Sequence, residues 1–237
     1  MPTYVVLPTY NEAENIPLLV PQLLALPHGL RVLIVDDGSP DGTGRIADRL
    51  AAENPGRVAV IHRPGKQGLG TAYMAGFRRA FELGADAVLT MDADFSHDPR
   101  YIPALLARSA EADVVIGSRY VPGGGAVDSP PLRRFISRAA NFAAHAALGL
   151  RAADVTAGFR WYRRAVLESI PWDRIFSSGY SFLIEMLFLI QQRGWRVAEV
   201  PIRFHDRTRG QSKISQIEIF KALYTVARLV YRRLRRR

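Results

Sequence analysis

Short apolar runs alternate with stretches of helical periodicity through the first half of the chain, and this alternation narrows the choice of fold. The apolar runs that we expect to form strands are residues 4–7, 32–35, 58–61, 87–91 and 114–116. The segments that we expect to form helices between them are residues 13–26, 42–53, 69–83 and 101–110. Strands that alternate with helices of this length form right-handed βαβ units. The pattern therefore predicts an α/β fold with a mostly parallel central sheet flanked by helices.

The second half of the chain is less regular. We expect helices over residues 132–148, over residues 180–193, and from residue 215 to the end of the chain. Residues 159–162 predict an edge strand, and residues 196–204 predict a strand that Pro201 interrupts. A chain of 237 residues can bury one substantial core. We predict one domain over residues 1–213 and a C-terminal amphipathic basic helix over residues 214–237.

Polar clusters follow four of the predicted strands. They occupy residues 8–12, 36–39, 92–94 and 117–119. Ligands of a parallel sheet bind beyond the carboxyl ends of its strands, so these clusters predict one site. The chain contains neither G-x-x-x-x-G-K-[ST] nor G-x-G-x-x-G, so a nucleotide site here is neither a P-loop nor a dinucleotide-binding fingerprint.

Asp92 and Asp94 flank one small residue directly after a predicted buried strand. Alternate strand positions point to the same side, and two buried carboxylates repel unless a cation neutralises them. Mg²⁺ or Mn²⁺ suits such a pair, because these ions take one or two carboxylates and keep positions open for substrate phosphates. An isolated motif of this kind favours a solvated turn, but the other polar clusters at the same edge favour the metal site.

Composition and charge exclude some functions. The chain has no cysteine, which excludes disulfides and thiolate metal sites. Its net charge is +10, and six arginines fall in the last ten residues. A cationic end attracts a membrane lipid, a nucleic acid or a phosphorylated substrate, and a solvated tail is the alternative. The aromatic-basic motifs of RNA-binding modules are absent, so we expect no nucleic-acid partner.

The final predicted helix is amphipathic. Its polar positions at helical spacing are Glu218, Lys221, Thr225, Arg228, Arg232 and Arg235, and apolar residues fill the remaining arc. An arc of this width suits a helix at a membrane surface or on a partner, and packing on the protein's own core is the alternative. No run reaches the ~20 apolar residues of a membrane span, and the N-terminus lacks the pattern of a signal peptide. We expect a cytoplasmic protein that associates peripherally with the cytoplasmic face of the membrane.

Several motifs carry a family resemblance. Residues 6–12 (VLPTYNE), 35–43 (VDDGSPDGT) and 91–94 (MDAD) resemble family 2 glycosyltransferases with the GT-A fold. Residues 65–70, 95–99, 117–120 and 158–160, with Asp206–Arg207 and residues 210–213 (GQSK), narrow the resemblance to the polyprenol-phosphate (dolichol-phosphate) mannose synthases within that family. The resemblance extends from Tyr4 to about Lys213, and the segment from Arg207 to Lys213 is its most specific part.

The resemblance implies roles for particular residues. Those implied to bind the nucleotide sugar are Pro8, Tyr10, Glu12, Val35, Asp37, Lys66, Asp92, Ala93, Asp94 and Ser96. Asp94 is implied to bind the metal, and Ser96 stands where some members carry a glutamine that also contacts it. Those implied to gather around phosphates are Arg119, Arg133, Arg207 and Lys213, with Ser137 adding a hydroxyl for the acceptor. The implied catalytic residues are Asp94, Arg119, Arg207 and Lys213.

The implied reaction moves mannose from GDP-mannose to a polyprenyl phosphate, with inversion and a divalent cation, Mg²⁺ or Mn²⁺. The acceptor phosphate is largely ionised at neutral pH, so no protein base is required. Transfer of glucose or an amino-sugar to a lipid phosphate is one alternative. A non-catalytic lipid- or nucleic-acid-binding protein on the same fold is another. An anionic membrane surface or a small membrane partner protein is the expected attachment.

Three other residues invite a functional interpretation. His97 and His205 suggest metal ligands, but we expect a neutral structural histidine at each position. Glu185 lies in an apolar helix and is either a buried hydrogen-bonding acid or a group that approaches the sugar.

Overall fold

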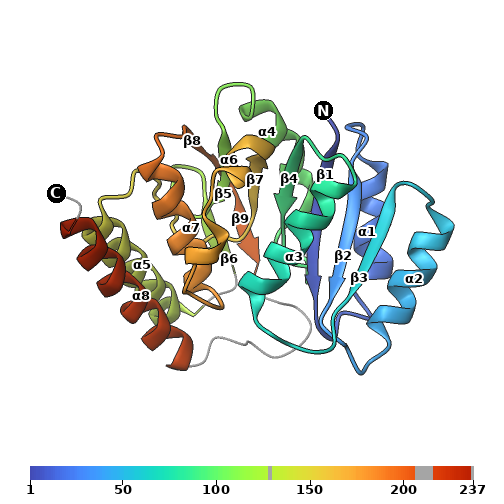
Figure 1. Cartoon of the computed structure of the whole chain (residues 1–237), viewed down its shortest axis with the longest axis horizontal. Helices are drawn as coiled ribbons and strands as arrows, with labels where there is room; N and C mark the ends of the chain where they lie inside the picture. The colour runs from blue at the N-terminus through green and yellow to red at the C-terminus, as the bar shows by residue number, and fades with distance from the viewer. Residues whose placement is uncertain (128–129, 206–215, 236–237) are drawn as a thin grey trace.

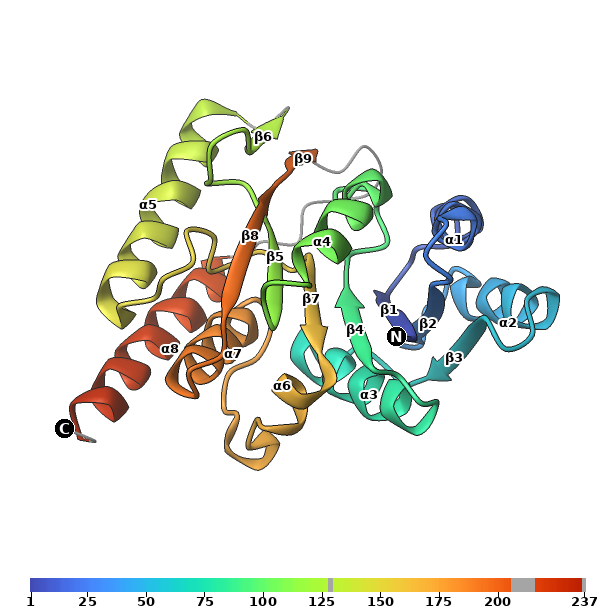
Figure 2. The same ribbon diagram turned by 90° about the horizontal axis from the view of Figure 1, so that it is seen from above.

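The computed structural model describes residues 1–127, 130–205 and 216–235, and seven of the described strands form one sheet (Figure 1). The strand order is β3-β2-β1-β4-β7-β5-β8. Figure 2, the view from above, shows helices on both faces of this sheet. The prediction of an α/β fold with a mostly parallel, helix-flanked sheet is confirmed.

The first half of the chain builds the parallel part of the sheet. Its elements are β1 (Thr3–Thr9), α1 (Ile16–Ala25), β2 (Arg31–Asp36), α2 (Thr43–Glu53), β3 (Val58–His62), α3 (Leu69–Glu82) and β4 (Ala87–Thr90). β1 pairs in parallel with both β2 and β4, and β2 pairs in parallel with β3. Helices cover both faces of β1, β2 and β4, which explains why these strands appear in the sequence as continuous apolar runs.

The prediction of an edge strand at residues 159–162 is wrong. β7 (Arg160–Arg163) lies inside the sheet, antiparallel to both β4 and β5 (Val114–Ser118). The side chain of Arg160 in this strand is fully buried despite its charge. Its guanidinium donates to the carbonyl oxygens of Leu183 and Val155 at 3.0 and 2.9 Å, which offsets part of the cost of burying the charge.

The predicted interruption at Pro201 is confirmed. β8 (Val197–Pro201) pairs in parallel with β5, and β9 (Arg203–His205) then pairs in parallel with β6 (Gly125–Val127) in a separate two-stranded sheet. Since β5 and β8 end side by side, this small sheet lies beyond their carboxyl ends. The chain therefore places β6 and β9 on the side where the polar clusters were predicted to meet.

The remaining described elements are helical. They are η1 (Pro99–Tyr101), α4 (Ile102–Arg108), α5 (Pro131–Leu148), α6 (Arg164–Glu168), η2 (Trp172–Arg174), α7 (Ser181–Gln192) and α8 (Gln216–Leu234). Within the described part of the chain, no helix combines the length and the apolarity needed to cross a bilayer.

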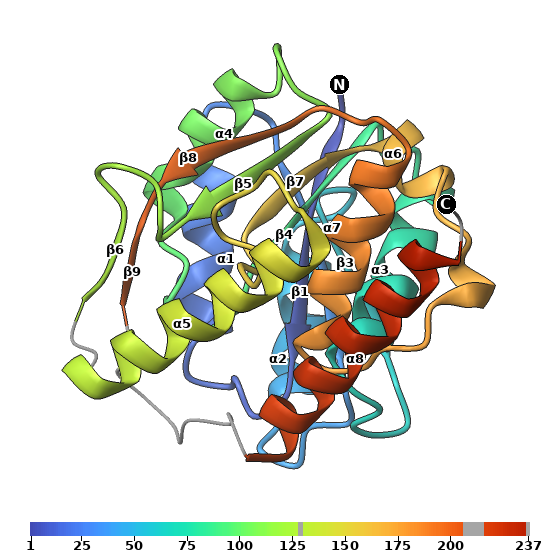
Figure 3. The ribbon, with the colours of Figure 1, turned by 90° about the vertical axis from the view of Figure 1, so that its left-hand side faces the viewer.

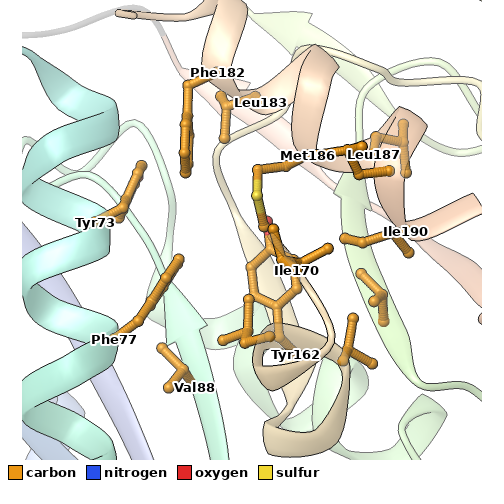
Figure 4. Close-up of a cluster of buried hydrophobic side chains, with 14 of the residues drawn as sticks. Tyr73, Phe77, Val88, Tyr162, Ile170, Phe182, Leu183, Met186, Leu187 and Ile190 are labelled. Carbon is orange, nitrogen blue, oxygen red and sulfur yellow. The ribbon is translucent and has the colours of Figure 1, made fainter. Parts of the chain in front are cut away.

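Two apolar layers, one on each face of the sheet, form the core. In one layer, α3 and α7 pack around Tyr162 of β7, and Tyr73 and Phe77 of α3 stack with ring centroids 5.9 Å apart (Figure 4). A Cβ on Gly76 of α3 would lie 2.5 Å from Cγ1 of Val6, so glycine is what lets α3 approach β1 this closely.

The predicted polar stripe of the last helix lies partly against the protein. Thr225 is buried and Arg232 approaches the buried Glu185, while α8 packs on α7 and α5. At these two positions the helix packs on the protein itself, which was the second of the two alternatives, so this part of the stripe does not face solvent. Large apolar side chains are exposed instead, both on α8 and on α5. Figure 3 shows these two helices side by side. They are Phe135, Phe142, Phe220, Leu223, Tyr224, Tyr231 and Leu234, and we call this surface the α5–α8 face.

Candidate active site

The carboxyl ends of β1, β2, β4 and β5 meet at one edge of the sheet, because these strands run in the same direction. The loop that follows each strand carries one of the predicted polar clusters. The structure therefore brings the clusters to one edge, as parallel pairing requires.

Two aspartates accept hydrogen bonds that shape the loops after β1 and β2 and link them. Asp36 accepts the hydroxyl hydrogen bonds of Thr9 and Ser39 at 3.1 and 2.5 Å. Asp41 accepts bonds from the Thr43 hydroxyl at 2.6 Å and from the Ala13 amide at 3.1 Å. Asp36 and Asp41 therefore hold the loops in shape.

Asp37 has a different environment. It is buried, and its Oδ1 lies 3.0 Å from Nη1 of Arg63. The two atoms are close enough for an ion pair but are poorly aligned, and neither makes a hydrogen bond within the described residues. Burial raises the pKa of the Asp37 carboxyl above its usual value, and the Arg63 guanidinium offsets part of that effect. The carboxylate can thus accept hydrogen bonds from a ligand at this edge.

The other residues implied to bind the nucleotide divide into two groups. Tyr10 and Lys66 lie together, with the Lys66 ammonium 5.0 Å from the centroid of the Tyr10 ring. Pro8 and Glu12 are partly exposed, and Glu12 Oε2 accepts a bond from Asn15 at 2.7 Å. The Val35 and Ala93 side chains, by contrast, are buried in the two apolar layers beneath the edge.

The loop over residues 92–97 holds the acidic motif in a closed turn. Oδ1 of Asp94 accepts bonds from the Ser96 hydroxyl and amide at 2.6 and 3.1 Å. Asp94 is 5% exposed, whereas the Asp92 side chain is 22% exposed at the rim. Phe95, between Asp94 and Ser96, adopts a positive φ of 62°, a strained conformation for a residue with a side chain.

The oxygen atoms of the loop over residues 92–97 suit a divalent cation that takes further ligands from a substrate. Asp92, Asp94 and Ser96 offer hard oxygen atoms from one short loop. Among the residues that the structure describes, no group of three or more His, Cys, Asp or Glu side chains is arranged to bind a metal alone. The donor set therefore suits Mg²⁺ or Mn²⁺ that takes its other ligands from a diphosphate and water.

Arg119 follows β5 and binds a buried carboxylate. Its Nε and Nη2 donate to the two oxygens of Asp154, each at 2.8 Å, and Nη2 also donates to the Thr156 hydroxyl at 2.8 Å. Burial opposes the charge of Arg119, yet its pairing with Asp154 raises its pKa above the usual value. The same pairing lowers the pKa of the Asp154 carboxyl despite its burial. Asp154 fixes the orientation of the guanidinium, and Nη1 takes no part in these bonds.

The residues implied to bind the acceptor are only partly described. The Ser137 hydroxyl on α5 lies 2.8 Å from the Tyr120 hydroxyl, and Tyr120 directly follows Arg119. Arg133 also lies on α5. Arg207 and Lys213 lie outside the described residues.

Two roles were open for Glu185, and the structure supports that of a buried hydrogen-bonding acid. Its Oε2 accepts bonds from the amides of Phe176 and Ser177 at 3.2 and 2.9 Å and from the Ser177 hydroxyl at 2.5 Å. Its Oε1 lies 3.6 Å from Nη1 of Arg232 on α8. The carboxylate thus joins α7, the loop before it and α8.

Sequence reasoning missed Asp154 and Arg63. Neither residue belongs to a motif with a recognisable spacing, and each pairs with a site residue far away in the chain. One signal was present, because Asp154 lies four residues before the 158–160 motif, at the start of a polar loop.

Comparison with solved structures identifies the class of fold. The chain has a TM-score of 0.68 to a crystal structure of glucosyl-3-phosphoglycerate synthase from Mycobacterium tuberculosis in complex with Mn²⁺, UDP and phosphoglyceric acid, at 19% identity over 97% of this chain and 78% of that one. Mannosyl-3-phosphoglycerate synthase from Rubrobacter xylanophilus gives a TM-score of 0.65 at 22% identity, over 100% of this chain and 74% of that one. The fold is the GT-A fold of nucleotide-sugar transferases.

Comparison of sequences identifies the family. Residues 4–170 match the model described as glycosyl transferase family 2. The chain is 46% identical to the polyprenol monophosphomannose synthase of Mycolicibacterium smegmatis, over 95% of this chain and 85% of that protein. It is 47% identical to the undecaprenyl-phosphate mannosyltransferase of Micrococcus luteus, over 94% of this chain and 91% of that protein. The chain belongs to glycosyltransferase family 2 and is a glycosyltransferase.

Proposed function

We propose that this enzyme transfers mannose from GDP-mannose to a polyprenyl phosphate and releases GDP. The observation that carries the proposal is the identity of 46–47%, over 94–95% of the chain, with two curated proteins named for mannosyl transfer to lipid phosphates. The loops at the carboxyl edge of the sheet support it, because they offer a base-binding acid, an acidic metal loop and basic side chains.

The donor binds across the first half of the edge. Asp37 accepts hydrogen bonds from the guanine or the ribose, for which its buried and misaligned Oδ1 is suited. Pro8, Tyr10 and Glu12 line the nucleoside pocket, and Lys66 beside Tyr10 faces the phosphates. The backbone at Val35 and Ala93 supplies the floor of the pocket, because both side chains point into the core.

Asp92 and Asp94, with Ser96 beside them, would hold a divalent cation at the diphosphate end of the donor. When bound, the cation would neutralise negative charge on the GDP leaving group. Asp94 is oriented for this task by the Ser96 hydroxyl and amide. We further propose that the whole domain, residues 1–213, serves this reaction and that residues 214–237 serve attachment.

The acceptor phosphate attacks the anomeric carbon directly. Its second ionisation falls near ~6, so it is a nucleophile at neutral pH without help from a protein base. Arg119, Arg133, Arg207 and Lys213 orient the two anionic groups, with Ser137 at the acceptor. Direct in-line attack inverts the configuration at the anomeric carbon.

The α5–α8 face attaches the enzyme to an anionic membrane surface on the cytoplasmic side, where the lipid acceptor is found. Exposed arginines accompany the exposed aromatic side chains of this face, and Arg134, Arg138, Arg228 and Arg235 are among them. Apolar side chains that enter the interface and arginines that meet lipid phosphates act together at such a surface.

The test is transfer of radiolabelled mannose from GDP-mannose to a short-chain polyprenyl phosphate, with and without Mn²⁺ or Mg²⁺. We expect Asp94→Asn to lower kcat/KM by at least about 100-fold. Asp98→Asn is the matched control, because Asp98 lies in the adjacent turn and caps η1. Full transfer after chelation, equal losses in both variants, or a preference for UDP-glucose over GDP-mannose would each contradict the proposal.

A further inference from the structure

The amide of Asp92 is held by a side chain from the far end of its own loop. The Asp92 N–H donates to Nδ1 of His97 at 2.9 Å. An acceptor nitrogen carries no proton, so this bond assigns the ring its tautomer, with hydrogen on Nε2. The first residue of the acidic motif is therefore tied to a ring that is only 3% exposed.

The position of this ring is set by distant parts of the chain. His97 stacks on Phe159 with centroids 5.1 Å apart and planes 19° apart, and the edge of Phe204 meets it at 5.5 Å. Phe159 directly precedes β7, and Phe204 lies in β9. The buried Phe159 and the partly buried Phe204 thus fix the ring, and the ring in turn fixes the loop.

The loop requires such a restraint. Phe95 has a positive φ of 62°, a conformation that residues with a side chain rarely adopt. The Asp94–Ser96 bonds close the turn across Phe95, and the Asp92–His97 bond closes the whole loop. Without the second bond, the Asp92 amide loses its partner and the loop can relax toward ordinary backbone angles.

We propose that His97 is a positioning residue for the proposed metal–diphosphate site. Its Nδ1 acts through the Asp92 amide and holds residues 92–97 in the conformation in which Asp92 and Asp94 share one cation. This inference rests on the proposed function only in assuming that a cation binds at this loop. Partners that orient metal ligands typically change metal affinity by about 10- to 100-fold when removed.

Two variants separate the contribution of the hydrogen-bond acceptor of His97 from that of its aromatic ring. His97→Phe keeps an aromatic ring between Phe159 and Phe204 but removes the acceptor. His97→Asn removes the ring but keeps an oxygen acceptor, Oδ1, at the same distance from the backbone as Nδ1. His145→Phe is the matched control, because it removes a similar bond, to the Ala152 carbonyl at 2.9 Å, away from the loop.

The measurement is Mn²⁺ binding to each variant in the presence of GDP, followed by the electron paramagnetic resonance signal of unbound Mn²⁺. We expect His97→Phe to raise the dissociation constant for Mn²⁺ by at least about tenfold. His97→Asn should recover most of that loss, even if it lowers the thermal midpoint further, and His145→Phe should leave Mn²⁺ binding unchanged.

The inference is overturned if His97→Phe binds Mn²⁺ as the parent does, or if His97→Asn binds it as poorly as His97→Phe. A parent enzyme that binds no Mn²⁺ with GDP would overturn both this inference and the metal dependence of the proposed function. Normal Mn²⁺ binding without mannose transfer would overturn the proposed reaction and leave the role of His97 standing.

Discussion

Asp36 and Asp37 show how adjacent residues of one type acquire different roles. Asp36 accepts hydroxyl bonds from Thr9 and Ser39 and so belongs to the framework of the loops. Asp37 faces Arg63 at 3.0 Å without a well-aligned bond and is suited to a ligand. The pair of aspartates is visible in the sequence, but their different roles depend on Thr9 of β1 and on Arg63, which directly follows β3, and only the fold brings these residues near.

Asp154 gives a prediction for stability as a function of pH. Burial alone would raise its pKa, but Arg119 lowers it below the usual value near 3.8. The folded protein therefore holds this proton less tightly than the unfolded chain does. The ionised carboxylate stabilises the fold above about pH 4, and this contribution is lost as the pH falls through the lowered pKa.

We expect Asp154→Asn to lower the free energy of unfolding by about 3 kcal/mol at pH 7, because it leaves the buried Arg119 charge without its partner. The difference from the parent should shrink below about pH 4. Urea titrations between pH 3 and pH 7 measure it, with the exposed Asp173→Asn as control. A difference that does not change with pH would contradict the assignment.

At the scale of elements, the sequence predicted most strands and helices but not all of their neighbours. Residues 87–91 and 114–116 are strongly apolar, so their burial was clear without a structure. The position of β7 between them was not, because Arg160 makes the segment look exposed and its two carbonyl partners lie in other segments. The sequence left the packing of α8 open, because it does not show that Arg232 lies beside the buried Glu185.

Glu185 gives a prediction for the joint between α7 and α8. Two amides and one hydroxyl donate to its Oε2, and Arg228 and Arg232 of α8 lie 4.0 and 4.6 Å from the ring centroid of Phe176. In Glu185→Gln, an amide NH₂ competes for the position of the acceptor oxygen and the partner charge of Arg232 is lost. We expect the thermal midpoint to fall by roughly 5 °C.

Differential scanning calorimetry measures this change, and Glu168→Gln, which alters an exposed pair with Arg164, is the control. The loss should appear as weaker docking of α8, so limited proteolysis should release the C-terminal helix more readily from Glu185→Gln than from the control. Equal thermal midpoints for Glu185→Gln and Glu168→Gln would contradict a stabilising role of Glu185 between α7 and α8.

At the scale of the molecule, the α5–α8 face lies at the opposite end from α1 and α2 (Figure 1). Phe142 and Phe220 are each 70% exposed there, and Leu18 on α1 is 51% exposed. We expect Phe142→Glu or Phe220→Glu to weaken binding to vesicles that contain phosphatidylglycerol by about tenfold, and Leu18→Glu to have no effect.

Vesicle co-sedimentation measures this binding, and vesicles of phosphatidylcholine alone test the contribution of charge. A parent that binds neither kind of vesicle would exclude direct attachment and favour a membrane partner protein. Equal losses in the Leu18 variant would show that the effect is general and that the α5–α8 face is not special.

The position of β7 between β4 and β5 has a consequence for how the chain folds during its synthesis on the ribosome. β4 is complete at Thr90, but the strand that covers its open side begins at Arg160. β5 likewise waits for both β7 and β8. During synthesis the edge of β4 therefore stays bare for some 70 residues, a period in which a chaperone or a neighbouring nascent chain competes with β7 for it.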